Sequence, residues 1–208
     1  MRRFIAPTLF VMFCCVLWPA RLQAADARPV IVAFGDSLTA GYGLANGESF
    51  PDALQKLLDR RGLHYRVVNQ GISGDTTSGG AARVRQVIEL KPAVVILELG
   101  ANDGLRGLPL TATRANLAGM IDQFRKNGAQ VLLAGITLPR NYGPDYIQGF
   151  DKIYRDLARE KRLALIPFLL EGVATNPSLM QEDSLHPTAE GARRVAATVL
   201  RYLLPLLK

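Results

Sequence analysis

The chain has 208 residues, of which 49% are hydrophobic and 21% are charged, and its formal net charge is +7. This length suits a single domain with a full hydrophobic core, and the composition excludes intrinsic disorder. The chain has two Cys and two His, which excludes a disulfide scaffold and a Cys/His metal cluster, so we expect no metal. The positive charge raises the question of a nucleic-acid or membrane partner.

The first 24 residues have the pattern of a secretory signal peptide. Two arginines precede the apolar run Phe4–Ala20, and small residues follow it, with cleavage favoured after Ala24 rather than after Ala27. A membrane span needs about 20 apolar residues, and Pro7 and Pro19 interrupt this shorter run. We therefore expect a protein that is exported to the periplasm or the extracellular space and keeps no stable membrane anchor.

Cleavage at that site changes the composition of the remaining chain. It removes both cysteines, which suits an oxidising compartment and excludes catalysis by a thiol, and it removes Arg2, Arg3 and Arg21. Of the 25 basic residues, 22 then remain against 18 acidic ones, so the net charge of +7 becomes +4. These basic residues are scattered and not interleaved with aromatics, so we expect no nucleic-acid partner.

Apolar runs and helical periodicity alternate along the rest of the chain. Continuous apolar runs rich in β-branched residues predict strands that are buried on both faces of a parallel sheet, and apolar residues at i, i+3 and i+4 predict helices. We expect one three-layer α/β domain over residues 25–208, with a five-stranded parallel sheet. In chain order the elements are a strand at Val30–Phe34, a helix at Phe50–Leu58, a strand at Tyr65–Val68, a weaker helix at Ala81–Leu90, a strand at Ala93–Leu97, a helix at Leu117–Phe124, a strand at Val131–Ile136, a helix at Phe150–Leu157, a strand at Leu163–Ile166 and a helix at Ala192–Leu203.

Residues whose side chains or backbone groups could take part in catalysis follow four of these strands. In parallel sheets, functional residues gather in the loops at the carboxyl ends of the strands. Ser37 follows the first strand, Gly74 the second and Asn102 the third, and Asp183 and His186 follow the last. We therefore expect these distant segments to meet at one edge of the sheet.

These residue types match the requirements of a serine nucleophile. Such a serine needs a base, an acid that orients the base, and donors for the oxyanion. His64 precedes the second strand, at the amino edge, which leaves His186 as the base. Asp183 lies three residues before His186, so a single turn can join their side chains. The loops hold three further aspartates, which we interpret as hydrogen-bond acceptors that brace the loops: Asp36, Asp75 and Asp103.

The four loop motifs resemble the conserved blocks of the SGNH (GDSL) hydrolase superfamily. They are Gly35-Asp36-Ser37-Leu38, Gly74, Gly100-x-Asn102-Asp103 and Asp183-x-x-His186, in the order of that family. Within it the chain is most similar to the secreted bacterial group of acyl-CoA thioesterase I, arylesterase and lysophospholipase. The resemblance implies a flavodoxin-like fold, no cofactor, and hydrolysis of acyl esters and thioesters through an acyl-enzyme.

The resemblance also implies the role of each site residue. Ser37 is the nucleophile, with Asp183 and His186 completing the triad, and Ser37, Gly74 and Asn102 form the oxyanion hole. In the related thioesterases the loop after the Asn block closes over the acyl chain, which makes the loop 104–109 a candidate lid. Candidate substrate-binding residues at the carboxyl edge are Leu105, Arg106, Leu108, Leu138, Pro139 and Tyr142.

Two other functions stay open. A carbohydrate or peptidoglycan deacetylase would use the same residues on a different acyl donor. A phosphate- or flavin-binding module is more remote, because the chain has no P-loop or Gly-x-Gly-x-x-Gly motif and such a module gives His186 no task. We expect a monomer whose partner is a small-molecule acyl ester or thioester.

Overall fold

The computed structural model describes residues 26–207, so the expected signal peptide lies outside the described residues. The fold is built on one sheet of five parallel strands in the order β2-β1-β3-β4-β5. The prediction of an α/β fold with a five-stranded parallel sheet is therefore confirmed. The strands are β1 (Val30–Gly35), β2 (Arg66–Gly71), β3 (Val94–Glu98), β4 (Gln130–Ala134) and β5 (Ala164–Ile166).

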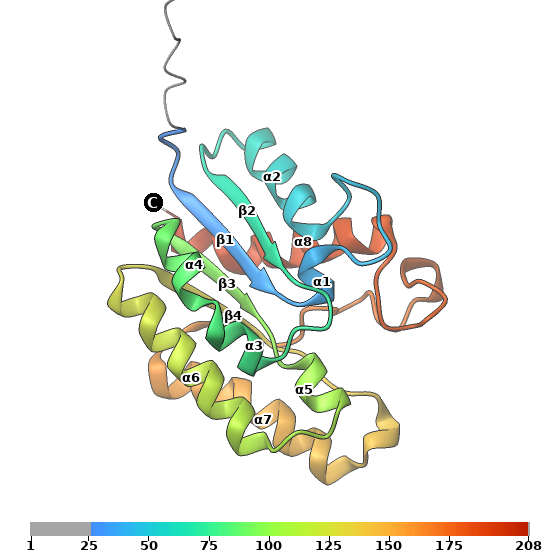
Figure 1. Ribbon diagram of the computed structural model, residues 1–208. Helices are drawn as coiled ribbons and strands as arrows, with labels where there is room; N and C mark the ends of the chain where they lie inside the picture. Colours follow the sequence, from blue (N-terminus) through green and yellow to red (C-terminus); the bar gives the residue numbers. More distant parts are fainter. Residues whose placement is uncertain (1–25, 208) are drawn as a thin grey trace, which may run out of the picture.

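Helices cover both faces of this sheet and make three layers. Helices α2 and α8 lie on one face, while α3, α4, α6 and α7 lie on the other (Figure 1). The helices are α1 (Ser37–Ala40), α2 (Phe50–Arg60), α3 (Thr77–Ala82), α4 (Val84–Glu89), α5 (Ala101–Leu105), α6 (Leu110–Lys126), α7 (Pro144–Lys161) and α8 (Ala189–Leu203), with 3-10 turns at Arg140–Tyr142, Pro177–Leu179 and Leu204–Leu206.

The apolar runs form the centre of the sheet because helices cover them on both sides. Every residue of β1 and β3 is buried, and the two strands pair in register, with Ile31 beside Val94 and Phe34 beside Leu97. The edge strand β2 is half-exposed and contains Arg66. Burial on both faces explains why the central strands are continuously apolar rather than alternating.

Local sequence signals fix where the long helices begin. Ser49 caps α2, and a reciprocal pair of hydrogen bonds with Asp52 forms a capping box, with Pro51 in the first turn. Thr188 caps α8 through the N–H of Gly191. Both helices turn their apolar faces toward the sheet and toward each other.

The helical prediction was wrong in two respects. The single helix expected at 81–90 is two short helices, α3 and α4, which are separated at Arg83 (φ −110°, ψ 10°). The first turn of α3 contains Gly79 and Gly80, so the sequence there has no apolar periodicity. Gly80 is needed for close packing, because a Cβ at this position would lie 2.3 Å from the Leu99 side chain. The short helices α1 and α5, which follow β1 and β3 directly, were not predicted.

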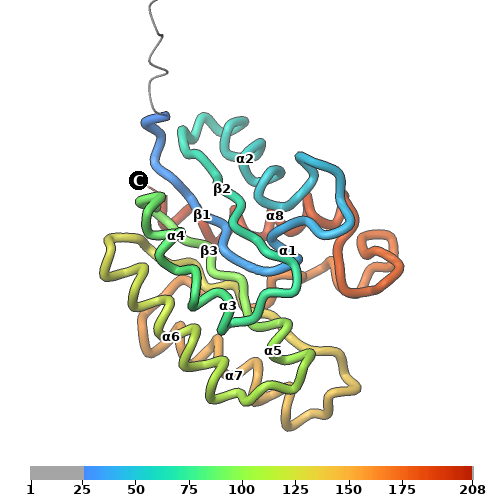
Figure 2. The backbone as a smooth tube through the Cα atoms, viewed as in Figure 1, coloured from blue at the N-terminus to red at the C-terminus, as the bar shows by residue number. Residues whose placement is uncertain are grey.

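The carboxyl ends of the strands gather the candidate residues. Figure 2 shows the segments after β1, β2 and β3 converging where α1, α3 and α5 begin. Side-chain hydrogen bonds join these segments, from Asn102 to Asp36 and from Thr77 to Asp103. Within residues 26–207, no helix has the length and apolar character that crossing a membrane requires.

Candidate active site

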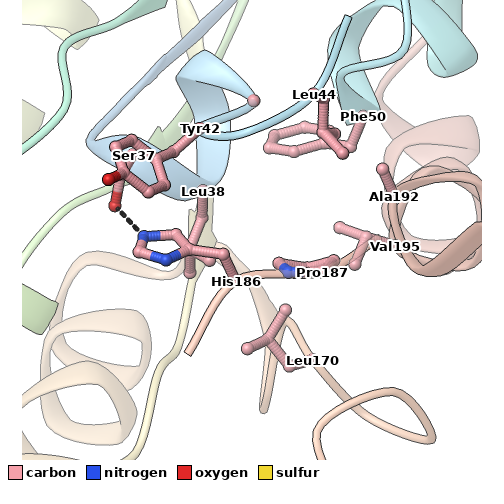
Figure 3. A pocket seen from close by; sticks show the side chains of 11 residues that line it. Ser37, Leu38, Tyr42, Leu44, Phe50, Leu170, His186, Pro187, Ala192 and Val195 are labelled. Carbon is pink, nitrogen blue, oxygen red and sulfur yellow. Dashed lines mark hydrogen bonds between the residues drawn. The ribbon is translucent and has the colours of Figure 1, made fainter. Parts of the chain in front are cut away.

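A continuous line of side chains joins the predicted nucleophile to the predicted acid. Ser37 begins α1 directly after β1, and its Oγ lies 2.8 Å from His186 Nε2. On the other side of the ring, His186 Nδ1 lies 2.6 Å from Asp183 Oδ2. Figure 3 shows the imidazole pointing at the serine hydroxyl. The structure therefore brings together three residues that were predicted from loops 149 positions apart in sequence.

The turn from Asp183 to His186 is held by its own hydrogen bonds. Asp183 Oδ1 accepts from the backbone N–H groups of Leu185 (2.9 Å) and His186 (3.0 Å), and Ser184 takes a left-handed conformation with φ 56°. Burial opposes ionisation of Asp183, but hydrogen bonds from the His186 side chain and these amides outweigh it and lower its pKa to about 2. Asp183 is therefore a carboxylate at neutral pH.

Two of the three predicted oxyanion donors, Ser37 and Asn102, line the same groove, and the place of Gly74 beside them stays a prediction. Within the described chain, neither the N–H of Ser37 nor that of Gly74 donates to a protein acceptor, so both are free to bind a ligand. Gly74 has φ +81°, a conformation that other residues rarely adopt. Asn102 uses one side-chain N–H on Asp36 Oδ2, at 3.2 Å, and keeps its second N–H for a ligand.

A buried arginine that sequence reasoning did not single out braces this site. The Arg83 guanidinium donates to the carboxylate of Asp75 (2.7 Å), the carbonyl of Gln70 (2.8 Å) and the carbonyl of Gly35 (2.9 Å). It also stacks 4.1 Å from the centre of the Phe34 ring. Asp75 is next to the predicted oxyanion glycine and Gly35 is two residues from the predicted nucleophile. Arg83 therefore fixes the loops after β1 and β2 relative to each other.

Asp103 makes the corresponding connection between the second and third loops. Its carboxylate accepts from the Thr77 N–H at 2.8 Å and from the hydroxyl groups of Thr77 and Thr113. This joins the start of α3 to α5 and α6. Asp36 and Asp75 likewise accept hydrogen bonds from neighbouring loops, so the interpretation of all three aspartates as acceptors is confirmed.

Asp36 also packs against a second buried acid that the sequence did not reveal. Glu98 ends β3, and both carboxyl groups are only 1% exposed. Burial raises the pKa of Asp36 to about 6 against the opposing hydrogen bonds, and burial together with the negative charge of Asp36 raises the pKa of Glu98 well above its usual value. A glutamate at the end of an apolar strand gave no periodicity signal, since its partners come from the turn after β1 and from α1.

A groove of about 350 Å³ leads away from the serine. Three of the six predicted substrate-binding residues, Leu105, Leu138 and Pro139, line it. Arg106, Leu108 and Tyr142 are not in its lining. Other lining residues, not predicted from the sequence, are Leu38, Ala101, Ile136, Thr137, Phe168, Leu170, Ala174, Met180, Ser184 and Leu185.

The other three predicted residues make hydrogen bonds between the loops. The Arg106 side chain donates to the Gly74 carbonyl at 2.9 Å. The Tyr142 hydroxyl donates to the Leu105 carbonyl at 2.8 Å, and the Leu108 carbonyl accepts from a tyrosine of α7. A direct role for these three in substrate binding stays a prediction.

Tyr42 is an aromatic residue at the site that sequence reasoning missed. Its ring centre is 4.6 Å from that of His186, and the residue is 53% exposed (Figure 3). Gly41 and Gly43, both with positive φ, flank it, and Gln181 donates to its carbonyl at 2.7 Å. The turn therefore presents an exposed aromatic ring beside the histidine.

The remaining site predictions can be placed as well. His64 is exposed and precedes β2, at the opposite end of that strand from Gly74. No group of three or more His, Cys, Asp or Glu that could hold a metal ion occurs within residues 26–207. The expectation that the protein needs no metal or cofactor stays a prediction.

The sequence matches the model of the GDSL-like Lipase/Acylhydrolase family over residues 33–194. Esterase TesA of Pseudomonas aeruginosa is 44% identical over 194 residues, which cover 93% of this chain and 96% of that protein. Thioesterase 1/protease 1/lysophospholipase L1 of Escherichia coli K12 is 36% identical over 206 residues, which cover 99% of this chain and 94% of that protein. The crystal structure of TesA has a TM-score of 0.83 and 45% identity to this chain, covering 86% of it and 99% of TesA.

The matched region includes all four loop motifs, and the relatives align over nearly their whole length. The parallel sheet with its edge cluster of serine, histidine and aspartate agrees with this match. The chain therefore belongs to the GDSL-like lipase/acylhydrolase family, the SGNH hydrolases, and is an ester hydrolase of that family.

Proposed function

We propose that the protein hydrolyses acyl esters and thioesters through a Ser37–His186–Asp183 triad and an acyl-enzyme intermediate. The observation that carries this proposal is the unbroken line from Ser37 Oγ to His186 (2.8 Å) and on to Asp183 (2.6 Å). The unpaired Ser37 N–H and the Asn102 amide in the same groove support the proposal, because a nucleophile without oxyanion donors would be a poor catalyst. The relatives named as an esterase and a thioesterase support the reaction class.

Each step follows from the position of these groups. Asp183, ionised at neutral pH, accepts from Nδ1–H and leaves Nε2 of His186 as the base. His186 takes the Ser37 proton while Oγ attacks the acyl carbonyl, and the developing oxyanion accepts from the Ser37, Gly74 and Asn102 N–H donors. The protonated imidazole then donates to the leaving group. A water molecule deprotonated by His186 releases the acid and regenerates the serine.

The groove favours an extended acyl chain over acetate. Its lining is largely apolar, and it begins at Ser37, Asn102 and His186. Each methylene buried in such a groove contributes about 0.8 kcal/mol. This arrangement suits the carboxylic-ester and thioester substrates of a lipid-type acylhydrolase better than those of a deacetylase.

We also propose that the protein is exported to the periplasm or the extracellular space, acts as a monomer and has no stable membrane anchor. The support for export is the basic, apolar and small-residue pattern of the first 24 residues. The mature chain would contain no cysteine, which suits an oxidising compartment.

A series of p-nitrophenyl esters from acetate to palmitate tests the reaction and the chain preference together. We expect Ser37→Ala to abolish turnover and labelling by a fluorophosphonate, while Ser78→Ala, which changes an exposed serine of α3, keeps both. We expect the highest kcat/KM on chains longer than acetate. Retained turnover in Ser37→Ala would overturn the mechanism, and a strong preference for acetate would favour the deacetylase.

A further inference from the structure

The carboxyl group of Glu98 lies directly behind the nucleophile turn, although it does not face the substrate groove. Its Oε2 accepts from the Asp36 N–H at 3.2 Å and from the Thr39 hydroxyl at 2.7 Å. Its Oε1 is fully buried and has no hydrogen-bond partner in the described residues. The residues on both sides of Ser37 are thus attached to one side chain of β3.

Asp36 connects Glu98 to the predicted oxyanion hole. Asp36 Oδ1 accepts from the Leu38 N–H at 3.1 Å, and Asp36 Oδ2 accepts from the Asn102 side-chain amide at 3.2 Å. The Asp36 N–H donates to Glu98, and each of the two buried carboxyl groups shifts the pKa of the other. A chain of contacts therefore runs from Glu98 through Asp36 to Asn102.

The glycine that precedes Asp36 makes room for this carboxyl. Gly35 is the register partner of Glu98 in the sheet. A Cβ at Gly35 would lie 2.4 Å from Glu98 Oε2 and 2.1 Å from Thr39 Oγ1, closer than any real Cβ contact. The close approach, and not a special backbone angle, therefore requires glycine at position 35.

We propose that Glu98 is a positioning residue that carries a proton at neutral pH and, by donating it to the Asp36 carboxylate, aims the Asn102 amide at the oxyanion. This inference rests on the proposed function of Asn102. Two N–H donors hold Asp36 in its ionised form, whereas Glu98 Oε1 has none. A proton on Oε1 satisfies the oxygen of this carboxyl pair that has no donor and removes the repulsion between two buried carboxylates.

The surrounding charges agree with this assignment. Burial and Asp36 both raise the pKa of Glu98, and no cation forms an ion pair with it in the described residues. The titratable or charged groups around Asp36 and Glu98 come from five segments: Asp36 after β1, Arg83 between α3 and α4, Asp103 in α5, Asp151 and Tyr154 in α7, and His186 after β5.

A double-mutant cycle separates positioning from general support of the fold. We expect Glu98→Leu to lower kcat about 10- to 100-fold with little change in KM, short of the 10²- to 10³-fold typical of a lost oxyanion donor. If Glu98 acts through Asn102, Glu98→Leu should add less than about threefold to the loss in an Asn102→Ala background. Losses that multiply in the double variant would overturn the inference.

Glu98→Gln tests whether Glu98 is protonated, and it tests the inference on its own if Glu98→Leu does not fold. The amide keeps an acceptor for Thr39 and Asp36 and a donor toward the Asp36 carboxylate, so we expect kcat within about threefold of wild type. A loss as large as that of Glu98→Leu would mean that a negative charge is needed and would overturn the inference.

Thermal unfolding of Glu98→Gln against pH gives a readout that does not depend on catalysis. A carboxyl whose pKa is raised in the folded state stabilises fully below its unfolded pKa, near 4.5, and loses that contribution as pH rises through the folded pKa. The Tm difference between Glu98→Gln and wild type should therefore shift in favour of the variant from pH 4 to pH 8. Glu89→Gln, an exposed control on α4, should show no such trend. The opposite slope would show that Glu98 is ionised and would overturn the inference. This outcome is independent of whether Ser37 is the nucleophile.

Discussion

Replacing Arg83 by alanine tests whether one buried cation holds the active-site loops. The ion pair of Arg83 with Asp75 is only 9% and 10% exposed in its side chains, so the variant leaves an unpaired, nearly buried carboxylate. Breaking such a pair typically costs about 3–5 kcal/mol. For a chain of about this length, each kcal/mol lowers Tm by about 2–4 °C, so Tm should fall by about 6–20 °C.

The loss should extend to catalysis, because Arg83 also holds the carbonyl groups of Gly35 and Gln70. We expect kcat on a p-nitrophenyl ester to fall more than KM rises, measured well below the lowered Tm. Arg83→Lys should recover only part of both losses, since an ammonium group cannot reach three acceptors with the planar fork of a guanidinium. Arg85→Ala, an exposed control two residues away, should change Tm by less than about 2 °C.

Differential scanning fluorimetry and steady-state kinetics on the same preparations supply both measurements. If Arg83→Ala melts within 2 °C of Arg85→Ala, the ion pair contributes no stability and the magnitude worked out above is refuted. If Tm falls but kcat stays at the wild-type value, the arginine supports the fold without positioning the loops.

Three further predictions address the site itself. Asn102→Ala should lower kcat on a p-nitrophenyl ester about 10²- to 10³-fold with a much smaller change in KM; an unchanged kcat would remove Asn102 from the oxyanion hole. The pKa of Asp183 in the folded protein is lowered from 3.8 to about 2, so its charge stabilises the fold above pH 3.8 and this contribution is lost as pH falls through about 2. The Tm of Asp183→Asn should therefore lie below that of wild type at neutral pH, and the difference should shrink toward pH 2. A difference that stays constant with pH would contradict the pairing of Asp183 with His186. Ala174→Trp, on the exposed rim of the groove, should lower kcat/KM about 15-fold on a decanoyl ester if it displaces two buried methylenes, while acetate hydrolysis stays the same; equal effects on both esters would place the acyl chain elsewhere.

The sequence alone specified the layers and the edge at which the site forms. Continuous β-branched runs such as Val30–Phe34 are stable only where helices cover both faces of a sheet, and this predicts parallel strands with functional loops at their carboxyl ends. The spacing of Asp183 and His186 predicts a contact within a single turn, and the structure has that contact. Each of these signals is local: a period, a turn or a short spacing.

Only the tertiary structure decided what surrounds and supports these residues. Arg83 and Glu98 act on loops 48 and 62 positions away in sequence, respectively, and neither interaction leaves a periodic pattern. Whether a side chain lines the groove or holds a loop depends on strand order and packing, which is why Leu138 lies in the groove and Tyr142 does not. Local composition determined the elements, whereas the buried polar contacts between them formed only once the sheet brought their partners together.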